Sequence, residues 1–107
     1  MVKKRAKGVR IELEAKKMLI EEGYLVEKKN TSRWQSDDFY GLFDLLAIGQ
    51  GVRLIQVKSH ISDFYKARRA IGLWMDANKI TGVSFEVWLR EPRKAWRCEK
   101  IKSQDAL

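Results

Sequence analysis

The stretch LFDLLAIGQGVRLIQVKS, residues 42–59, decides the fold of this 107-residue chain. Two apolar runs, residues 42–48 and 52–59, flank the connection Gly49-Gln50-Gly51, which has glycine where a positive φ is needed. The stretch therefore predicts a β-hairpin. Ile48 then faces Val52, and continuing the antiparallel pairing outward from the turn places Asp44 opposite Gln56.

Asp44 is the unusual residue of this hairpin, because a carboxylate among apolar neighbours is costly unless it is paired, hydrogen-bonded or bound to a metal. Residues two apart on a strand share a face, so Lys58 is expected beside Gln56 on the face that carries Asp44. The opposite face is expected to be almost wholly apolar, with Phe43, Leu45, Ala47, Ile55 and Val57. This pattern indicates a sheet covered on both sides.

Two interpretations fit the three polar residues. One is a buried Asp44–Lys58 ion pair completed by Gln56, although such pairs contribute little net stability. The other is a divalent-metal site for Mg²⁺, or Mn²⁺, with a carboxylate oxygen from Asp44 and the amide oxygen of Gln56 as ligands. Lys58 would then orient or deprotonate an attacking water and neutralise charge on a phosphate. Buried charges cluster at functional sites, which favours the metal site.

Periodicity along the rest of the chain predicts one domain, residues 1–107, of mixed α/β or α+β class with helices packed on a central sheet. Gly23 is expected to end the first helix, and Ser62 is expected to cap the second. The predicted elements are a helix over 9–22, strands over 24–29, 42–48 and 52–59, a helix over 62–79, and strands over 83–90 and 95–101. Residues 30–41 are predicted to form a loop.

The net charge of the chain indicates which class of molecule it binds. Lys and Arg total 22 against 14 Asp and Glu, a formal charge of +8. Concentrated basic residues favour a polyanion through counterion release, so nucleic acid is the expected partner. No apolar run is long enough to cross a bilayer or to follow the basic N-terminus of a secretory signal, so a cytoplasmic location is expected. A single cysteine, Cys98, excludes an intrachain disulfide, and a core or interface position is expected for it.

The order of these elements resembles the PD-(D/E)XK nuclease superfamily and, within it, the archaeal-type Holliday junction resolvases. The resemblance spans roughly residues 7 to 90. The residues that carry it are Lys7-Gly8, Glu12 and Gly23-Tyr24 around the first helix, Phe43-Asp44-Leu45 on one strand, and Ile55-Gln56-Val57-Lys58-Ser59 on the next. The resemblance implies a restriction-endonuclease-like αβββαβ core with a mixed central sheet.

The resemblance also implies an activity: a Mg²⁺-dependent endonuclease that resolves four-way DNA junctions and leaves a 5′-phosphate. The implied catalytic residues are Glu12, Asp44, Gln56 and Lys58, with Asp44, Gln56 and Glu12 as metal ligands. Helix geometry agrees for Glu12, which lies at the edge of the apolar stripe, whereas Glu14 is expected to face solvent. The residues expected to contact DNA are Lys4, Arg5, Lys7, Arg10, Ser32, Arg33, Ser59, Lys66, Arg68 and Arg69.

Gln56 departs from the family pattern, which has an acidic residue at this position. The site therefore has one negative charge fewer, which predicts weaker metal binding unless Glu12, Asp37 or Asp38 compensates. Two alternatives stay open. One is a superfamily nuclease acting on nicked, flapped or ordinary duplex DNA, and the other is a basic DNA-binding module that binds no metal.

A homodimer is expected, because resolving a junction needs two symmetric cuts and two-fold symmetry supplies two sites. Trp88 is expected on a face with Ser84 and Glu86, and Trp96 on a face with Cys98. A large aromatic side chain on a polar face suggests a covered surface such as an interface. The alternative is that another part of the same chain covers the two tryptophans.

Overall fold

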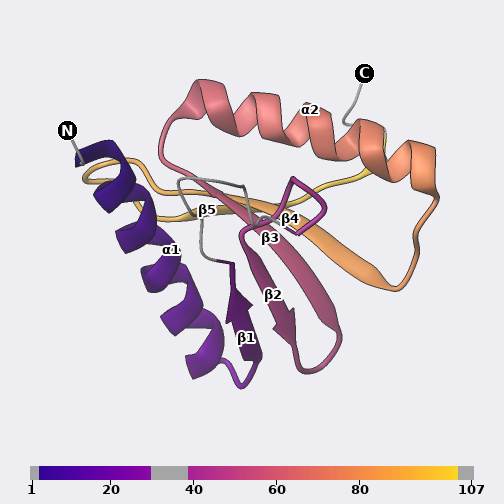
Figure 1. Cartoon of the computed structure of the whole chain (residues 1–107), viewed down its shortest axis with the longest axis horizontal. Helices are drawn as coiled ribbons and strands as arrows, with labels where there is room; N and C mark the ends of the chain where they lie inside the picture. Colours follow the sequence, from indigo (N-terminus) through magenta and orange to yellow (C-terminus); the bar gives the residue numbers. More distant parts are fainter. Residues whose placement is uncertain (1–2, 30–38, 104–107) are drawn as a thin grey trace.

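The computed structural model describes residues 3–29 and 39–103, with side chains described from residue 8 onward. A helix, three strands, a second helix and two strands follow one another as predicted (Figure 1). The elements are α1 Lys3–Glu21, β1 Leu25–Lys28, β2 Leu45–Ile48, β3 Val52–Lys58, α2 Ile61–Asn78, β4 Val83–Leu89 and β5 Arg97–Lys100.

The five strands form one mixed sheet in the order β1-β2-β3-β4-β5. Neighbouring strands are antiparallel except β3 and β4, which are parallel and connected through α2. The predicted hairpin register is confirmed from Ile48–Val52 at the turn to Leu45–Ile55 at the far end of β2. Lys58, the last residue of β3, therefore lies beside Leu89, the last residue of β4.

Both faces of the sheet are covered, as predicted, and each helix packs on one of them. The face under α2 holds the larger cluster, with an aromatic group at its centre. Its members are Phe43, Leu54, Phe64, Ala67, Ile71, Phe85, Val87, Leu89 and Ile101. The cluster under α1 consists of Ile11, Ala15, Leu19, Leu45, Ala47, Ile55, Val57 and Trp88.

Helix α1 begins at Lys3, six residues before the predicted start at Val9. The basic residues that precede Val9 are good helix formers, and the single glycine among them, Gly8, is tolerated inside a helix. The predicted end is confirmed. Gly23 adopts a φ of 96° and the N–H of Tyr24 donates to the carbonyl of Leu19 at 3.1 Å, which closes the last turn in a Schellman motif.

The prediction that Ser62 caps α2 is wrong. The N-cap is His60, whose extended backbone precedes the helix and whose carbonyl accepts from the N–H of Phe64 at 3.0 Å. His60 makes no side-chain capping bond, and Ser62 lies within the first helical turn. The helix ends at Lys79, which has a φ of 50° and donates its N–H to Met75.

The two tryptophans proposed as part of an interface are instead covered by the same chain. Trp88 is only 2% exposed and packs against Trp96 with ring centroids 5.7 Å apart. The indole N–H of Trp96 donates to Glu14 on α1 at 3.0 Å, so Glu14 does not simply face solvent as predicted. Cys98, expected in a core or interface, is exposed on β5.

Among the described residues, no helix combines the length and the apolar content that a membrane crossing requires. The sheet instead has helices on both faces, and Asp44, directly before β2, and Lys58, the last residue of β3, lie at the same end of it.

Candidate active site

Asp44 lies directly before β2 and is held by hydrogen bonds from its backbone and from its side chain. Its backbone N–H donates to the carbonyl of Ile55 at 2.9 Å, and its carbonyl accepts from the N–H of Lys29 at 3.1 Å. Its carboxylate Oδ2 accepts the backbone N–H of Val57 at 2.8 Å. The backbone contacts come from strands on both sides, so this carboxylate has a defined position against β3.

The alternation of faces breaks at Asp44, contrary to the sequence prediction. Ile55 is the register partner of Leu45 and also accepts from Asp44, so two consecutive residues oppose one partner, as in a β-bulge. Asp44 therefore meets β3 at the N–H of Val57 and not directly opposite Gln56. Phe43, predicted on the face of Leu45, packs in the cluster under α2 instead.

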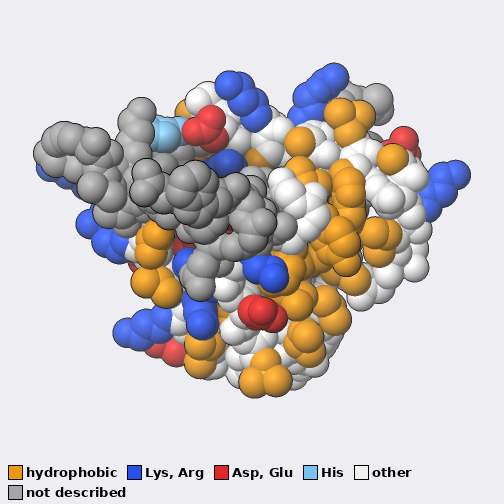
Figure 2. Space-filling view, in the orientation of Figure 1, with side chains coloured by type: hydrophobic (Ala, Val, Ile, Leu, Met, Phe, Trp, Pro, Cys, Tyr) orange, Lys and Arg blue, Asp and Glu red, His pale blue; other side chains and the backbone are white. Residues whose placement is uncertain are grey.

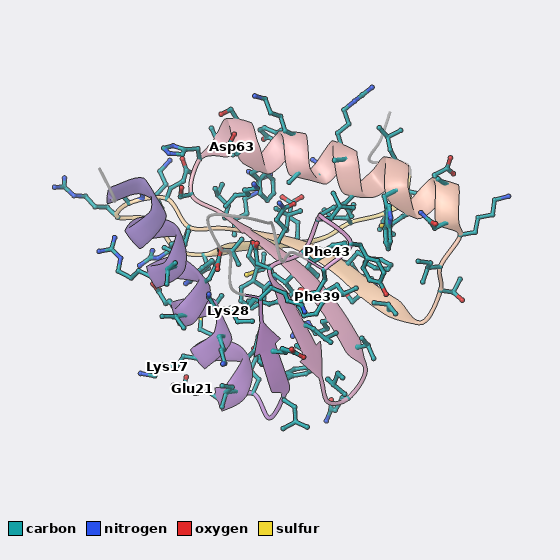
Figure 3. All side chains as sticks on the ribbon, in the orientation of Figure 1. Lys17, Glu21, Lys28, Phe39, Phe43 and Asp63 are labelled. Atoms are coloured by element: carbon teal, nitrogen blue, oxygen red, sulfur yellow. The ribbon has the colours of Figure 1, made fainter. Side chains whose placement is uncertain are left out.

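The short turn before Asp44 explains this break. The carbonyl of Phe43 accepts the N–H of Phe39 at 2.8 Å, and the two residues form an isolated β-bridge. Figure 3 shows Phe39 and Phe43 close together beneath α2. The Phe43 carbonyl accepts within this turn, and the backbone N–H of Val57 donates to the Asp44 side chain and not to a main-chain carbonyl of β2.

Gln56 and Lys58 meet on one face of β3, as predicted. With the amide oriented to satisfy both of its neighbours, Gln56 Nε2 donates to the carbonyl of Leu42 at 3.0 Å and Oε1 accepts from Lys58 Nζ at 3.3 Å. Both residues are half-buried. The Gln56 amide thus holds the Lys58 ammonium group at the end of β3. Gln56 and Lys58 flank Val57, whose N–H donates to the Asp44 carboxylate.

Glu12 reaches the sheet from α1, but its contact is with a residue that the sequence analysis did not identify. Lys28 Nζ lies 3.4 Å from Glu12 Oε1, and the Lys28 side chain is only 9% exposed. Figure 3 shows Lys28 on β1 beside α1. A lysine inside a four-residue strand gives little periodic signal, and only the packing of α1 over β1 reveals its role.

The Glu12–Lys28 pair lies next to Asp44 through the sheet. Lys28 is the register partner of Leu45, the residue after Asp44, and the following N–H, that of Lys29, binds the Asp44 carbonyl. The structure therefore brings Glu12, Lys28 and Asp44 to neighbouring positions at one end of β1 and β2. Gln56 and Lys58 lie at the adjoining end of β3.

The oxygen donors suit a hard divalent cation better than a soft one. Mg²⁺ is held in proteins by one or two carboxylates and keeps several waters, so Asp44 with an amide oxygen from Gln56 matches its chemistry. The described residues contain no group of three or more His, Cys, Asp and Glu side chains placed to hold a metal by themselves. Asp37 and Asp38, considered as compensating acids, lie outside the described residues.

The residues expected to contact DNA fall into three groups. Arg10 is exposed on α1, and Lys66 and Arg69 are exposed on α2. Arg68 lies 3.9 Å from Glu99 on β5, and Ser59 follows β3 directly. The side chains of Lys4, Arg5 and Lys7, and the residues Ser32 and Arg33, lie outside the described part of the chain.

These elements define an α/β domain with a restriction-endonuclease-like αβββαβ core, so the predicted fold class is confirmed. Among solved structures, the chain is similar to Archaeoglobus fulgidus Hjc, a Holliday junction resolvase from an archaeal hyperthermophile, with a TM-score of 0.57 and 21% sequence identity. The similarity covers 92% of this chain and 74% of that chain. Comparison with protein-family models and with curated proteins gives no match.

Proposed function

We propose that this chain is a metal-dependent endonuclease that resolves four-way DNA junctions. The observation that carries the proposal is the hydrogen bond of Asp44 to Val57, the residue between Gln56 and Lys58 on β3. The fold in which it occurs is similar to that of a Holliday junction resolvase. The formal charge of +8 supports a polyanionic substrate.

The proposal gives each side chain a role. Asp44 holds Mg²⁺ through its carboxylate, and Gln56 contributes its amide oxygen. When bound, the ion supplies Lewis-acid activation of the phosphodiester and lowers the pKa of water. Lys58 places its ammonium group beside the developing charge on the phosphate, an interaction that typically contributes a few kcal/mol, on the order of 3, to the transition state. Glu12, on α1, adds a second carboxylate to the proposed metal site.

Two other functions remain as alternatives. A nuclease of the same fold that acts on nicked, flapped or duplex DNA would use the same residues with a different substrate preference. A basic DNA-binding module would use the positive surface alone, and the substitution of Gln56 for an acid favours this alternative. The two alternatives differ in metal dependence, which provides the first test.

The deciding experiment compares a four-way junction with a linear duplex of matched sequence, in Mg²⁺ and in EDTA. The proposal expects paired cuts in the junction arms with Mg²⁺, no cutting in EDTA, and little cutting of the linear duplex. Equal cutting of both substrates would support the general nuclease. Tight junction binding with no cutting in Mg²⁺ or Mn²⁺ would support the binding module.

A homodimer belongs to this proposal, because a pair of symmetric cuts needs two sites. Trp88 does not supply the interface, since it is buried within the chain, and the half-buried Trp96 packs against it. Figure 2 shows hydrophobic side chains gathered over the β2–β3 hairpin and the C-terminal half of α2. Tyr40, 72% exposed, packs against the Trp74 ring of α2, and Ile48, 47% exposed, is the last residue of β2 in this hairpin. Both support a covered surface there.

Sedimentation equilibrium at micromolar concentration tests the dimer. A mass near twice the 12.5 kDa of one chain supports it, and a mass near 12.5 kDa contradicts it. The variant Ile48→Glu should shift the mass toward that of one chain, and the exposed Ile20→Glu on α1 serves as the control.

A further inference from the structure

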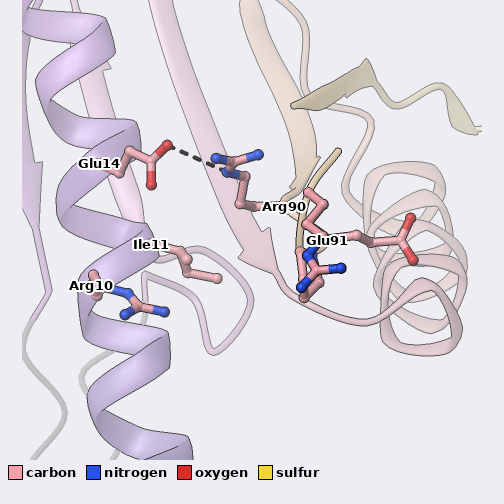
Figure 4. Close-up of a pocket in the computed structure, with 7 residues that line it drawn as sticks. Arg10, Ile11, Glu14, Arg90 and Glu91 are labelled. Atoms are coloured by element: carbon pink, nitrogen blue, oxygen red, sulfur yellow. Dashed lines mark ion pairs between the residues drawn. The ribbon is translucent and has the colours of Figure 1, made fainter. Parts of the chain in front are cut away.

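A surface pocket of about 360 Å³ lies between α1 and the segment that follows β4. Its lining residues are Arg10, Ile11, Glu14, Arg90, Glu91, Pro92 and Arg93. Figure 4 shows Arg10 and Glu14 projecting from α1 on one side and Arg90 on the other, with the Glu14–Arg90 ion pair across the gap. Three arginines from two elements far apart in sequence thus surround one hollow.

The geometry of α1 separates this pocket from Glu12. At about 100° per residue, Arg10 and Glu14 project to one side of the buried Ile11, and Glu12 projects to the other. Glu12 meets Lys28 on β1, while Glu14 meets Arg90 beyond β4. The helix therefore carries the candidate metal ligand on one flank and the basic pocket on the opposite flank.

Arg90 is held in place before any ligand arrives. Its Nε lies 3.4 Å from Glu14 Oε1, its terminal nitrogen donates to the carbonyl of Lys94, and its guanidinium lies 5.9 Å from the centre of the Trp96 ring. Glu14 is itself fixed by the indole N–H of Trp96 at 3.0 Å. A guanidinium fixed in this way loses little conformational entropy on binding an anion.

The charge of the pocket remains positive after its internal pairs are counted. Glu14 is paired with Arg90, and Glu91 lies 3.6 Å from Lys94, so each carboxylate already has a cation. Arg10 is exposed, and so is Arg93, which has a φ of 63° in the turn after Pro92. These two arginines add positive charge beyond the paired groups, and planar guanidinium groups match the oxygens of phosphate.

The pocket lies next to the candidate active site through the parallel strands. The N–H of Arg90, the residue after β4, donates to the carbonyl of Lys58 at the end of β3 at 2.9 Å, and neighbouring strands lie about 4.8 Å apart. Successive nucleotides of one DNA strand advance about 3.4 Å along the helix axis. Lys58 projects toward the face under α2 and the pocket opens beside α1, so a DNA strand that crosses this end of the sheet would pass both within a few nucleotides.

We infer that the pocket formed by Arg10, Arg90 and Arg93 binds a backbone phosphate of the DNA substrate, a few nucleotides from the phosphate that reacts at Asp44. The inference rests on the proposed function, because it assigns a second contact to the same substrate. It adds Arg90 and Arg93 to the residues proposed to bind DNA, and it assigns a backbone phosphate as the group that Arg10 contacts. The contact is to phosphate, so it positions the strand without reading its sequence.

The variants Arg10→Gln and Arg93→Asn test this pocket. Asparagine tolerates a positive φ, so Arg93→Asn removes the charge with little backbone strain. Lys79→Asn is the matched control, because Lys79 is also an exposed basic residue of positive φ, 50°, and lies before β4 at the opposite end of the sheet. The measurements are the Kd for a four-way junction labelled with a fluorophore, from 50 to 200 mM salt, and the cleavage rate with saturating enzyme.

Each pocket variant should bind the junction about fivefold more weakly at low salt, and its plot of log Kd against log salt should be shallower by about 0.9. Lys79→Asn should match the parent. Unchanged affinity and salt slope in both pocket variants, with a parent that binds and cuts, would overturn the pocket alone. A parent that neither binds nor cuts the junction would overturn the proposed function and this inference with it.

Discussion

The carboxylate of Asp44 accepts the backbone N–H of Val57 at 2.8 Å, in place of a main-chain acceptor from the neighbouring strand. The same carboxylate is therefore both a candidate metal ligand and a hydrogen-bond acceptor that stabilises the hairpin. Substitutions at this position therefore have separate effects on activity and on stability, and a pair of variants can tell the two apart.

Asp44→Asn should abolish cleavage and leave the free energy of unfolding nearly unchanged, because the amide oxygen still accepts from Val57. Asp44→Ala should also be inactive and should lose about 1–3 kcal/mol, the cost of a buried donor without a partner. Junction cleavage and urea unfolding of the two variants check both statements. Turnover by Asp44→Asn at the rate of the parent would contradict the proposed site.

Gln56→Glu should lower the Mg²⁺ concentration that gives half-maximal cleavage, because it restores a carboxylate at the site. It also replaces an N–H donor with an oxygen 3.0 Å from the Leu42 carbonyl, so the metal-free variant should unfold at a lower temperature than the parent. A Mg²⁺ titration of junction cleavage measures the first effect, and thermal unfolding without Mg²⁺ measures the second. A variant that needs more metal than the parent would show that the site depends on the neutral amide.

Glu12→Gln tests the acidic contribution from α1. The amide oxygen can still accept from Lys28, so the helix should keep its position while the site loses one negative charge. We expect a higher Mg²⁺ requirement for cleavage with junction binding unchanged. Glu21→Gln, on the last turn of the same helix, is the control. If both variants have the same Mg²⁺ requirement as the parent, Glu12 is not a metal ligand.

Glu86 should govern part of the acid sensitivity of the fold. Burial alone would raise the pKa of this carboxyl, but hydrogen bonds from Arg53, Trp88 and Ser84 outweigh it and lower the pKa. Stabilisation by a carboxyl with a lowered pKa is fully present above the ordinary value of 4.5 and is lost as the pH falls through the lowered folded value. Glu86→Gln should therefore cost about 3 kcal/mol at pH 7 and less at pH 3, measured by urea unfolding at both.

The Cys98 thiol should react slowly at neutral pH even though the residue is exposed. Partial burial of the sulfur, together with the charge of Glu86, raises its pKa to about 11. The thiolate is the reactive form, so the rate of alkylation by iodoacetamide should keep rising tenfold per pH unit up to pH 10. Glutathione, with an ordinary thiol, is the reference, and a plateau for Cys98 near pH 9 would contradict the raised pKa.

The hairpin was predictable because its information is local. Gly49 and Gly51 mark the turn, and alternation then determines which residues face each other from Ile48 to Leu45. Gly49 has a second function that alternation does not show, since a Cβ there would lie 2.7 Å from the Tyr24 ring. The prediction failed at Phe43 because the bulge at Asp44 depends on the Phe39–Phe43 bridge, which no short pattern encodes.

The partners of the candidate site residues were less predictable than the residues themselves. Asp44 was conspicuous as a charge in an apolar run, and Glu12 followed from the family resemblance, with which helix geometry agreed. Lys28 and Glu14 gave no such signal, because their significance depends on how α1 crosses the sheet, with β1 on one side and Trp96 on the other. Packing between elements distant in sequence determined both contacts.

The parallel pairing of β3 with β4 also sets an order of folding. The hairpin that carries Asp44, Gln56 and Lys58 closes over three residues, and hairpins of this kind form within about 1–10 μs. Arg90 joins Lys58 only after the whole of α2 has been formed and docked, and such non-local pairing is slow. The hairpin part of the site, with Asp44, Gln56 and Lys58, is thus assembled early. Arg90 and the proposed phosphate pocket take their places last, so the newly made chain would complete its proposed nucleic-acid surface only when the core is closed.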